Sequence, residues 1–206
     1  MKVLIIGSGG HAKVVADILL AIPDMKPIGF ASRDSASTKV LGLPILGDDR
    51  SAKDIPHDGL IIAIGDNRLR AKIHETYAGR GETFISAIHP SAIIAPDVII
   101  EPGCMVCAGV VVNSGSRIGA HTILNTGCTV DHDCTVGPFA HVAPGVNLAG
   151  NVTVGEEAFM GIGSCAMQGL TIGDRAVVGA GAAVIRDVPS GQTVVGVPAR
   201  ELSSEK

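Results

Sequence analysis

In the second half of the chain, apolar residues recur at every sixth position. Starting at position 94, every sixth residue is apolar for sixteen consecutive positions. The series is Ile94, Ile100, Val106, Val112, Ile118, Leu124, Val130, Val136, Val142, Leu148, Val154, Met160, Ala166, Ile172, Val178 and Val184. Because 46% of all residues are apolar, such a run has a chance probability on the order of 10⁻⁶. The period is not that of a helix, and it predicts short strands stacked in a parallel β-solenoid.

The fifth residue of each six is small or of modest size, as at Cys104, Ser116, Cys128 and Ala140. A small side chain at this position fits a tight corner between two strands. Fifteen sixes cover residues 94–183, and these 90 residues divided by 18 give five turns of a three-sided prism. Stacked coils fill such a prism with Ile, Val and Leu, which explains why aromatic residues are only 2% of the chain and Trp is absent.

Residues 1–89 follow a different pattern, in which short apolar runs alternate with helical stretches. The expected elements are strands at Lys2–Ile6, Pro27–Ala31 and Leu60–Ile64, and helices at His11–Ala21 and Asn67–Gly79. This order predicts a small Rossmann-like α/β domain with a parallel sheet over residues 1–89. The solenoid domain, with a C-terminal tail, would then cover residues 90–206.

Composition and charge exclude some classes of function for this chain. The chain has 16 basic and 20 acidic residues and a net charge of −4, so a nucleic-acid partner is not expected. No apolar run approaches the roughly 18 residues that a membrane span needs, and the Val3–Ile6 run leads into glycines without a signal-peptide core. We therefore expect a soluble cytoplasmic protein with no membrane partner.

Two patterns are weak candidates for a metal site. Cys104 and Cys107 form a Cys-x-x-Cys pair, but Cys104 occupies the small corner position of the repeat, so packing accounts for it. His121, His132 and His141 are eleven and nine residues apart, which is not the paired spacing of a zinc-binding solenoid. We expect no metal, with zinc as the alternative.

The segment Gly7-Ser8-Gly9-Gly10-His11-Ala12 has the G-x-G-x-x-A form of a dinucleotide fingerprint, between a strand and a helix. Glycines let the backbone approach a phosphate, and the helix N-terminus supplies N–H donors and the positive end of a dipole. Because about 90 residues hold only one half of a complete dinucleotide fold, we favour a nucleotide diphosphate over NAD. A purely structural turn is the alternative.

A second strand end, Ile64-Gly65-Asp66-Asn67, places glycine and polar side chains where open α/β sheets bind ligands. Arg70, which follows in the expected helix, is a candidate phosphate contact. The alternative is an ordinary helix start that Asp66 or Asn67 caps, with Arg70 in solvent.

Asp131-His132-Asp133 is the strongest catalytic candidate within the solenoid. A hydrogen bond to a flanking carboxylate fixes the tautomer of a histidine and raises its basicity. Such a histidine suits general-base chemistry. The alternative is a solvated polar corner of a coil.

Together these segments resemble a known family. The glycine-rich α/β start is combined with Ala63-Ile64-Gly65-Asp66-Asn67, Ile88-His89-Pro90-Ser91, Asn125-Thr126, Asp131-His132-Asp133, Ala149-Gly150-Asn151 and Gly196-Val197-Pro198-Ala199. In this combination the chain resembles the bacterial nucleotide-sugar acetyltransferases, near the bacillosamine-pathway and perosamine N-acetyltransferases and the sialic acid O-acetyltransferase homologues. The resemblance covers nearly the whole chain and implies that the solenoid is a left-handed β-helix.

The resemblance also implies roles for individual residues. It makes His132 the general base and Asp133 the carboxylate that supports it. Acetyl-CoA would lie in a groove between neighbouring prisms of a homotrimer, in contact with His141, Gly150, Ile162 and Ala180. The nucleotide sugar would contact Gly9, Gly10, His11, Asp34 and Gly65. Asp34 would replace one carboxylate of an Asp-Asp pair that relatives often carry after the second strand.

The expected reaction is direct acetyl transfer from acetyl-CoA to the amino group of a nucleotide-linked sugar, without a covalent enzyme intermediate. His132 would remove a proton from the amine as it attacks the thioester, and N–H donors around Gly150 would stabilise the oxyanion. Two alternatives stay open. One is O-acetylation of a sugar hydroxyl, as in the sialic acid enzymes, and the other is a non-catalytic solenoid that only binds a nucleotide sugar.

Overall fold

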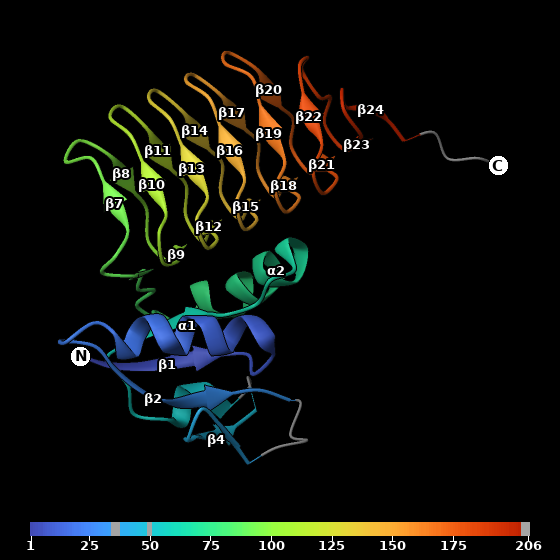
Figure 1. The fold of residues 1–206 in the computed structure, drawn as a ribbon. Coiled ribbons are helices and arrows are strands. Elements are labelled where there is room, and N and C mark those ends of the chain that lie inside the picture. The colour runs from blue at the N-terminus through green and yellow to red at the C-terminus, as the bar shows by residue number, and fades with distance from the viewer. Residues whose placement is uncertain (34–37, 49–50, 203–206) are drawn as a thin grey trace.

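The computed structural model of the chain describes residues 1–33, 38–48 and 51–202. It contains an α/β region near the N-terminus and a three-sided parallel β-helix formed by the rest of the chain (Figure 1). The α/β region lies against one side of the β-helix, with helix α2 (Asn67–Ala78) at the junction.

The α/β region is built on a five-stranded sheet in the order β3-β4-β2-β1-β5, in which every neighbouring pair is parallel except β3 and β4. Its elements are β1 (Lys2–Ile6), α1 (Gly10–Leu20), β2 (Lys26–Ala31), β3 (Lys39–Val40), β4 (Leu43–Gly47), a 3-10 helix (Ser51–Asp54), β5 (Gly59–Ile62) and α2. The predicted strands and helices are confirmed, with ends that differ by at most two residues. Strands β3 and β4 were not predicted.

Strand β1 is buried on both faces, which is why its sequence is an unbroken apolar run. Val3 and Ile5 belong to the core that includes α1 and continues into the β-helix. Leu4 and Ile6 pack on the opposite face, with Tyr77 of α2. One continuous apolar core therefore joins the α/β region to the β-helix.

From β7 to β22 every strand has two residues, and each strand from β7 to β19 pairs in parallel with the strand 18 residues further on. The strands are β6 (Ala87–Ile88), β7 (Ile93–Ile94), β8 (Ile99–Ile100), β9 (Met105–Val106), β10 (Val111–Val112), β11 (Arg117–Ile118), β12 (Ile123–Leu124), β13 (Thr129–Val130), β14 (Thr135–Val136), β15 (His141–Val142), β16 (Asn147–Leu148), β17 (Thr153–Val154), β18 (Phe159–Met160), β19 (Cys165–Ala166), β20 (Thr171–Ile172), β21 (Val177–Val178), β22 (Ala183–Val184), β23 (Thr193–Val195) and β24 (Arg200–Glu201). The predicted 18-residue turn is confirmed.

These strands form the three sides of the prism. The junction sheet, which faces the α/β region, has the order β24-β23-β21-β18-β15-β12-β9-β6. The β7 sheet contains β7, β10, β13, β16, β19 and β22, and the β8 sheet contains β8, β11, β14, β17 and β20. The chain runs from the junction sheet to the β7 sheet, then to the β8 sheet, and back to the junction sheet (Figure 1).

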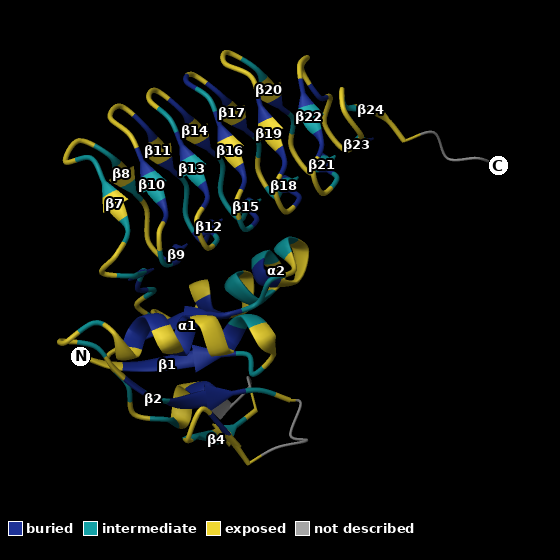
Figure 2. Cartoon of the chain, viewed as in Figure 1, coloured by how far each residue is buried: buried dark blue, intermediate teal, exposed yellow. Residues whose placement is uncertain are grey.

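The repeated apolar positions point into the prism, as predicted. From Val106 to Val184 every member of the series is buried, whereas Ile94 and Ile100, near the open end of the prism, are half-buried. Fifth-position residues such as Ser116 and Cys128 are fully buried at the corners. Figure 2 shows how buried and exposed segments alternate along the coils. Because burial of one Val, Leu or Ile contributes about 1.5–3 kcal/mol, aliphatic side chains suffice to stabilise a prism that lacks aromatic residues inside.

Arg70, in the first turns of α2, joins the two halves. Its guanidinium is buried and donates to three carbonyls of the β-helix, from Nε to His121 at 2.8 Å and from Nη2 to Phe139 at 2.6 Å and Ala140 at 3.3 Å. Its Nη1 donates to the carbonyl of Ile64 in the α/β region at 2.8 Å. Burial lowers the pKa of Arg70 to about 10, and the charge of Asp66 opposes part of this shift, so the group stays charged at neutral pH. Both expectations for Arg70, a phosphate contact and a solvated side chain, are therefore wrong.

The β-helix offers these carbonyls because one of its corners repeats a left-handed backbone conformation. Four residues spaced 18 apart have φ between 56° and 58°: His121, Phe139, Glu157 and Arg175. This conformation is uncommon for residues other than Gly. Three of the four carbonyls accept hydrogen bonds from α2, including one from Asn67 Nδ2 to Glu157 at 3.0 Å. Asp66 caps α2 as predicted, because its side chain accepts from the Leu69 N–H at 2.7 Å.

Four rings close the junction next to Arg70. The ring of His74, from α2, lies 4.5 Å from His121 and 4.9 Å from Phe84 between centroids. His121 stacks in parallel on Phe139 at 5.2 Å. Burial, and then the charges of His74 and Arg70, lower the pKa of His121 to about 3. The ring cluster therefore holds His121 neutral.

Replacement of Arg70 by Met should lower the free energy of unfolding by about 2–6 kcal/mol, because two buried carbonyls lose their donor and each costs about 1–3 kcal/mol. The control is Arg68→Met, at an exposed position two residues away, which should change it by less than about 0.5 kcal/mol. Urea unfolding followed by circular dichroism measures both. Equal stability of the two variants would show that the guanidinium does not hold the junction.

Stability should also fall as the pH drops below 6.5, the ordinary pKa of a histidine. His121 takes up a proton near that pH in the unfolded chain but only near pH 3 in the folded protein, so stability is fully present above pH 6.5 and is lost toward pH 3. His121→Phe should flatten this dependence, and Phe139 shows that phenylalanine fits the same left-handed corner. Melting temperatures measured across this range test the prediction, and an unchanged slope in the variant would contradict it.

Candidate active site

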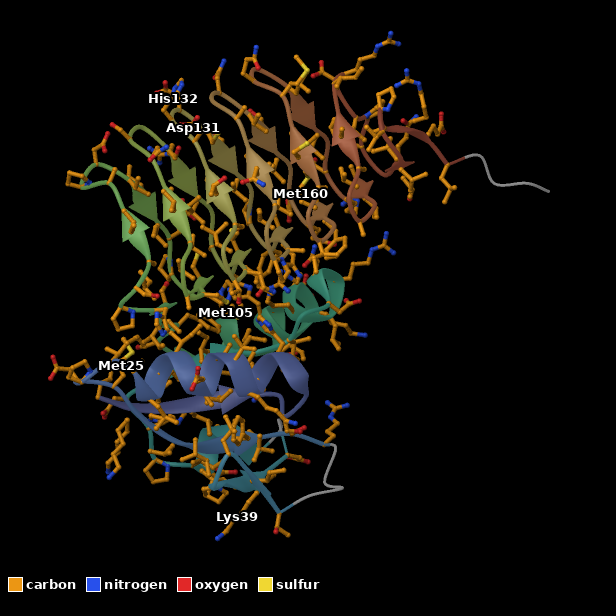
Figure 3. The ribbon with its side chains drawn as sticks, viewed as in Figure 1. Met25, Lys39, Met105, Asp131, His132 and Met160 are labelled. Atoms are coloured by element: carbon orange, nitrogen blue, oxygen red, sulfur yellow. The ribbon has the colours of Figure 1, made fainter. Side chains whose placement is uncertain are left out.

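His132 stands at a β-helix corner directly after β13. Its Nδ1 lies 2.8 Å from Asp133 Oδ2, and the two side chains are 60% and 67% exposed. Figure 3 shows His132 and Asp131 at the outer edge of the β-helix. Because an ionised carboxylate only accepts hydrogen bonds, Nδ1 carries the proton and Nε2 is left as the basic nitrogen.

The charges around His132 make it a stronger base. The hydrogen bond to Asp133, and then the charge of Asp131, raise the pKa of His132. Asp131 is held ionised, because Asn113 Nδ2 and the His132 backbone N–H both donate to its Oδ1, at 2.8 Å and 2.7 Å, and lower its pKa. His132 thus has a fixed tautomer, an exposed basic nitrogen and a raised pKa, which suit a general base.

Gly150 lies one coil beyond His132 and leaves room for its ring. A Cβ atom at position 150 would overlap the imidazole at Nε2, so a larger residue there would displace the base. The Gly150 N–H has no hydrogen-bond partner within residues 1–33, 38–48 and 51–202. It is therefore a donor that stays available beside the basic nitrogen, where an oxyanion would need one.

His141 belongs to a second cluster, at the junction of the two halves. Its Nε2 accepts from Asn125 Nδ2 at 3.1 Å, and its ring centre lies 6.2 Å from that of His11. Burial, followed by the charges of Arg70 and His11, lowers the pKa of His141 to about 4. His141 is therefore a neutral side chain whose Nε2 already has a partner.

His11 and Gly65 complete this second cluster. The two lie side by side, since a Cβ atom at Gly65 would stand 3.9 Å from His11 Cβ. His11 Nε2 is 3.2 Å from the sulfur of Met105 in the junction sheet. Burial, and then the charge of Arg70, lower the pKa of His11 to about 4. The fold thus brings together two predicted nucleotide-sugar contacts, His11 and Gly65, and one predicted acetyl-CoA contact, His141.

The glycine turn leaves the start of α1 open. Gly9 is the N-cap of α1 without a side-chain cap, and no atom lies within 4 Å of the positions where Cβ atoms of Gly9 and Gly10 would stand. The first turn has no acidic side chain. Free N–H groups and open space at a helix N-terminus suit a phosphate, which favours a ligand site over a purely structural turn.

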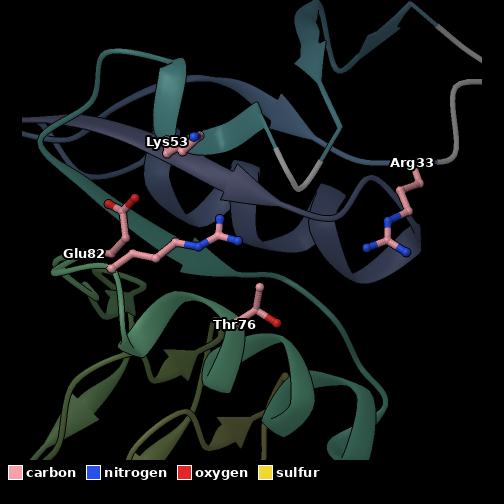
Figure 4. A pocket seen from close by; sticks show the side chains of 5 residues that line it. Arg33, Lys53, Thr76 and Glu82 are labelled. Carbon is pink, nitrogen blue, oxygen red and sulfur yellow. The ribbon is translucent and has the colours of Figure 1, made fainter.

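One hollow includes Gly7 of this turn, and a second hollow adjoins the first. The first, of about 430 Å³, lies at the carboxyl edge of the sheet and includes Gly7, Ser32 and Lys72. The other, of about 660 Å³, is lined by Arg33, Lys53, Thr76, Arg80 and Glu82 (Figure 4). Open α/β sheets bind ligands at their carboxyl edge. Asp34, the remaining predicted nucleotide-sugar contact, lies outside the described residues.

Ile162 and Ala180 lie one coil apart on the corner that leads from the junction sheet to the β7 sheet. The Gly181 N–H, directly after Ala180, donates to the carbonyl of Ile162 at 2.9 Å. The Ile162 side chain and Ala180 are both exposed. The β7 sheet separates this corner from His132 and carries a hollow of about 500 Å³ that reaches Asp131.

His132 and the α/β region lie on opposite sides of the β-helix. The α/β region covers the junction sheet, whereas His132 projects from the corner between the other two sheets. In Figure 3, Met105 marks the covered side, and Asp131 and His132 mark the far edge. The base and the nucleotide-sugar contacts, as predicted from the sequence, therefore do not meet within one chain.

The three histidines weighed as zinc ligands also lie apart. His121 is in the buried ring cluster, His132 on an exposed corner and His141 at the junction. Among the described residues, no three His, Cys, Asp or Glu side chains are grouped so that they could hold a metal ion. Burial raises the pKa of Cys104 to about 12 and that of Cys107 to about 11, which disfavours the thiolate that binds metals.

Comparison with known proteins agrees with this fold. Residues 2–77 match the PglD N-terminal domain family. GDP-perosamine N-acetyltransferase from Escherichia coli O157:H7 is 32% identical over 146 residues, which are 68% of this chain and 66% of that protein. The solved acetyltransferase domain of PglB from Neisseria gonorrhoeae FA1090, in complex with acetyl coenzyme A, has a TM-score of 0.94 at 39% identity and covers 98% of both chains. The chain belongs to the nucleotide-sugar acetyltransferases of the hexapeptide-repeat family.

A second solved member of the nucleotide-sugar acetyltransferases is a variant of GDP-perosamine N-acetyltransferase from Caulobacter crescentus in complex with CoA and GDP-perosamine. It has a TM-score of 0.95 at 42% identity and covers 99% of this chain and 98% of that chain. The predicted fold class, an α/β region followed by a left-handed β-helix, is confirmed. Membership of this enzyme family excludes the non-catalytic solenoid. Within the described parts of the chain, no helix combines the length and apolar character needed to cross a bilayer.

Sequence reasoning missed Asn113, and for Gly150 it missed that the small residue leaves room for the imidazole. Asn113, which holds Asp131 in place, lies 18 residues before it, so the coil period could have paired the two. The same period could have shown that Gly150 lies beside His132, because these two residues are also 18 apart.

Asp133→Asn should lower the pKa of His132, because the hydrogen bond to Asp133 is the largest cause of its raised value. Titration of the His132 Hε1 signal by NMR measures this change. Asp174→Asn is the control, since Asp174 is a β-helix aspartate that accepts from the Glu156 N–H at another corner. Identical titrations in Asp133→Asn and the unaltered chain would contradict the assignment.

Proposed function

We propose that this enzyme transfers the acetyl group of acetyl-CoA to the amino group of a nucleotide-linked amino sugar, with His132 as the general base. The observation that carries the proposal is the His132–Asp133 pair, an exposed base of fixed tautomer on the β-helix of an acetyltransferase. The solved relative that holds CoA together with GDP-perosamine supports this substrate class. The perosamine relatives are also described as N-acetyltransferases, which favours an amine over a hydroxyl as the acceptor.

The chemistry needs one base and one oxyanion donor. The sugar nitrogen attacks the thioester carbon, a C–N bond forms, and His132 Nε2 takes the proton that the nitrogen loses. Asp133 stabilises the resulting imidazolium through Nδ1. The Gly150 N–H is the candidate donor to the oxyanion, which collapses as the C–S bond breaks. The imidazolium of His132 then gives its proton to the leaving sulfur, so that CoA leaves as the thiol and His132 is neutral again. No cysteine is needed as nucleophile, and burial raises the pKa of Cys128 and Cys134.

The nucleotide sugar is assigned to the carboxyl edge of the α/β sheet. Its diphosphate would lie on the open start of α1 at Gly9 and Gly10. The sugar would then extend past His11 and Gly65 toward the β-helix. The two adjoining hollows, one of which includes Gly7, offer space for the nucleoside, with basic side chains such as Arg33 and Lys53 around them.

Acetyl-CoA is assigned to the surface of the β-helix. Ile162 and Ala180, stacked one coil apart, offer a small apolar strip for the cofactor. His141 lies next to His11, so a thioester near His141 would meet a sugar held at the α/β region. The solved relative that contains acetyl coenzyme A supports the choice of donor.

We further propose a homotrimer in which His132 of one chain serves the α/β region of the next. The support is geometric, because His132 lies at the vertex opposite the α/β region and an active site needs both. Cyclic symmetry then repeats the same interface and produces three equal sites. The five unpaired cysteines favour a reducing compartment such as the cytoplasm.

His132→Ala should lower kcat by about 10² to 10⁴, the usual contribution of a general base. The melting temperature should stay the same, because the side chain is 60% exposed. Release of CoA thiol with UDP-linked and GDP-linked amino sugars measures the activity. Near-normal kcat in the variant would remove His132 as the base, and acetylation of hydroxyl sugars in place of amino sugars would favour O-transfer.

A further inference from the structure

We propose that Ser116 is a positioning residue for the His132–Asp133 pair, an inference that rests on the proposed function of His132. Ser116 is fully buried at the fifth position of its repeat. Its Oγ donates to the Asp131 carbonyl at 2.8 Å and accepts from the Cys134 N–H at 3.1 Å. One hydroxyl thus bridges the first and the last residue of the corner that presents the base.

Several other corners of the β-helix close on themselves. The Ala158 N–H, for example, donates directly to the carbonyl of Gly155, three residues earlier, at 3.3 Å. Among the described residues, corner 131–134 has no such bond between its two ends. The Ser116 hydroxyl occupies that place, so it replaces the closing bond and sets the width of the turn.

Cys134 shows that a thiol can form the same bridge. It occupies the fifth position one coil after Ser116, and its Sγ donates to the Ala149 carbonyl at 3.2 Å and accepts from the Val152 N–H at 3.4 Å. Ser116→Cys is therefore a conservative variant that the fold itself supports.

Ser164 is the matched control. It is a fully buried serine at the same repeat position, yet its hydroxyl has no hydrogen-bond partner in the described part of the chain. The corner one coil beyond it closes directly, from the Ala182 N–H to the Gly179 carbonyl at 3.2 Å. Loss of the Ser164 hydroxyl therefore removes no bridge.

Alanine at position 116 should let corner 131–134 close on itself. Corners stacked on an alanine do so already, since Ala140 lies beneath the bond that Ala158 makes to Gly155. The backbone between the two ends would then change its path and carry the imidazole and its carboxylate out of their present alignment. The fold should survive, because alanine already fills this repeat position at Ala140 and Ala158.

The neighbours of His132 on its own corner and on the two adjacent coils determine its pKa. On its own corner the charged groups are Asp131 and Asp133, and a change in the path of the turn would weaken the contact with Asp133. The coil after it presents Gly150, which has no charge, and the coil before it presents Asn113, bonded to Asp131. A disturbed turn should therefore move the titration of His132 to lower pH.

The test compares Ser116→Ala, Ser116→Cys and Ser164→Ala with the unaltered enzyme, and includes His132→Ala in parallel. Ser116→Ala should lower kcat by about 10-fold to 100-fold, as expected for a base that is misplaced by a fraction of an ångström to 1 Å, with little change in the KM for acetyl-CoA. The acidic limb of the pH profile and the NMR titration of His132 should both move to lower pH. Ser116→Cys should restore both, and Ser164→Ala should match the unaltered enzyme.

The outcomes separate this inference from the proposed function. An inactive His132→Ala together with normal kcat and normal His132 titration in Ser116→Ala would overturn the positioning role alone. A lowered melting temperature in Ser116→Ala without a change in kcat or titration would overturn it as well. Full activity of His132→Ala would instead overturn the proposed function, and the NMR titration would still decide whether Ser116 positions the imidazole.

Discussion

Arg70 directs its hydrogen bonds to backbone carbonyls from both halves of the molecule, and the position of the α/β region on the β-helix depends on that geometry. A planar guanidinium with several donors in fixed directions can reach His121 and Phe139 on one side and Ile64 on the other. An ammonium could not bridge so many groups. Once the junction is fixed, His11 and Gly65 lie against His141. The open start of α1 is then held at a fixed position relative to the junction sheet.

The stacking of 18-residue coils fixes the position of the general base, just as Arg70 fixes the junction. Each residue at a corner is stacked on its equivalents one coil before and one coil after, so Asn113 holds Asp131 and Gly150 leaves space for His132. The interior is packed with aliphatic side chains, and the polar groups are confined to corners and outer faces. A rigid prism can therefore hold an exposed histidine in one orientation without burying it.

Most of the fold could be predicted from the periodicity of the sequence, whereas the side-chain geometry at the junction could not. The sixteen apolar positions predicted the coil, and the Lys2–Ile6 run with its glycine turn predicted the first strand of the sheet. Arg70 could not be placed from its sequence neighbours, because its partners His121 and Phe139 lie 51 and 69 residues away. The Asp131-His132-Asp133 triplet was recognisable because its contacts are local. Its dependence on Ser116 could be seen only once the coils were stacked.

The central claim is that each active site takes its base from one chain and its nucleotide-sugar contacts from another. Co-expression of His132→Ala with Gly9→Val tests it most directly, since position 9 has φ −73° and open space, so valine should fit the fold and block only the ligand. Each variant alone should be inactive, and a random mixture should regain about one quarter of the unaltered acetyl-transfer rate, because one pairing in four joins two intact halves. A mixture as inactive as the separate variants would contradict the shared site.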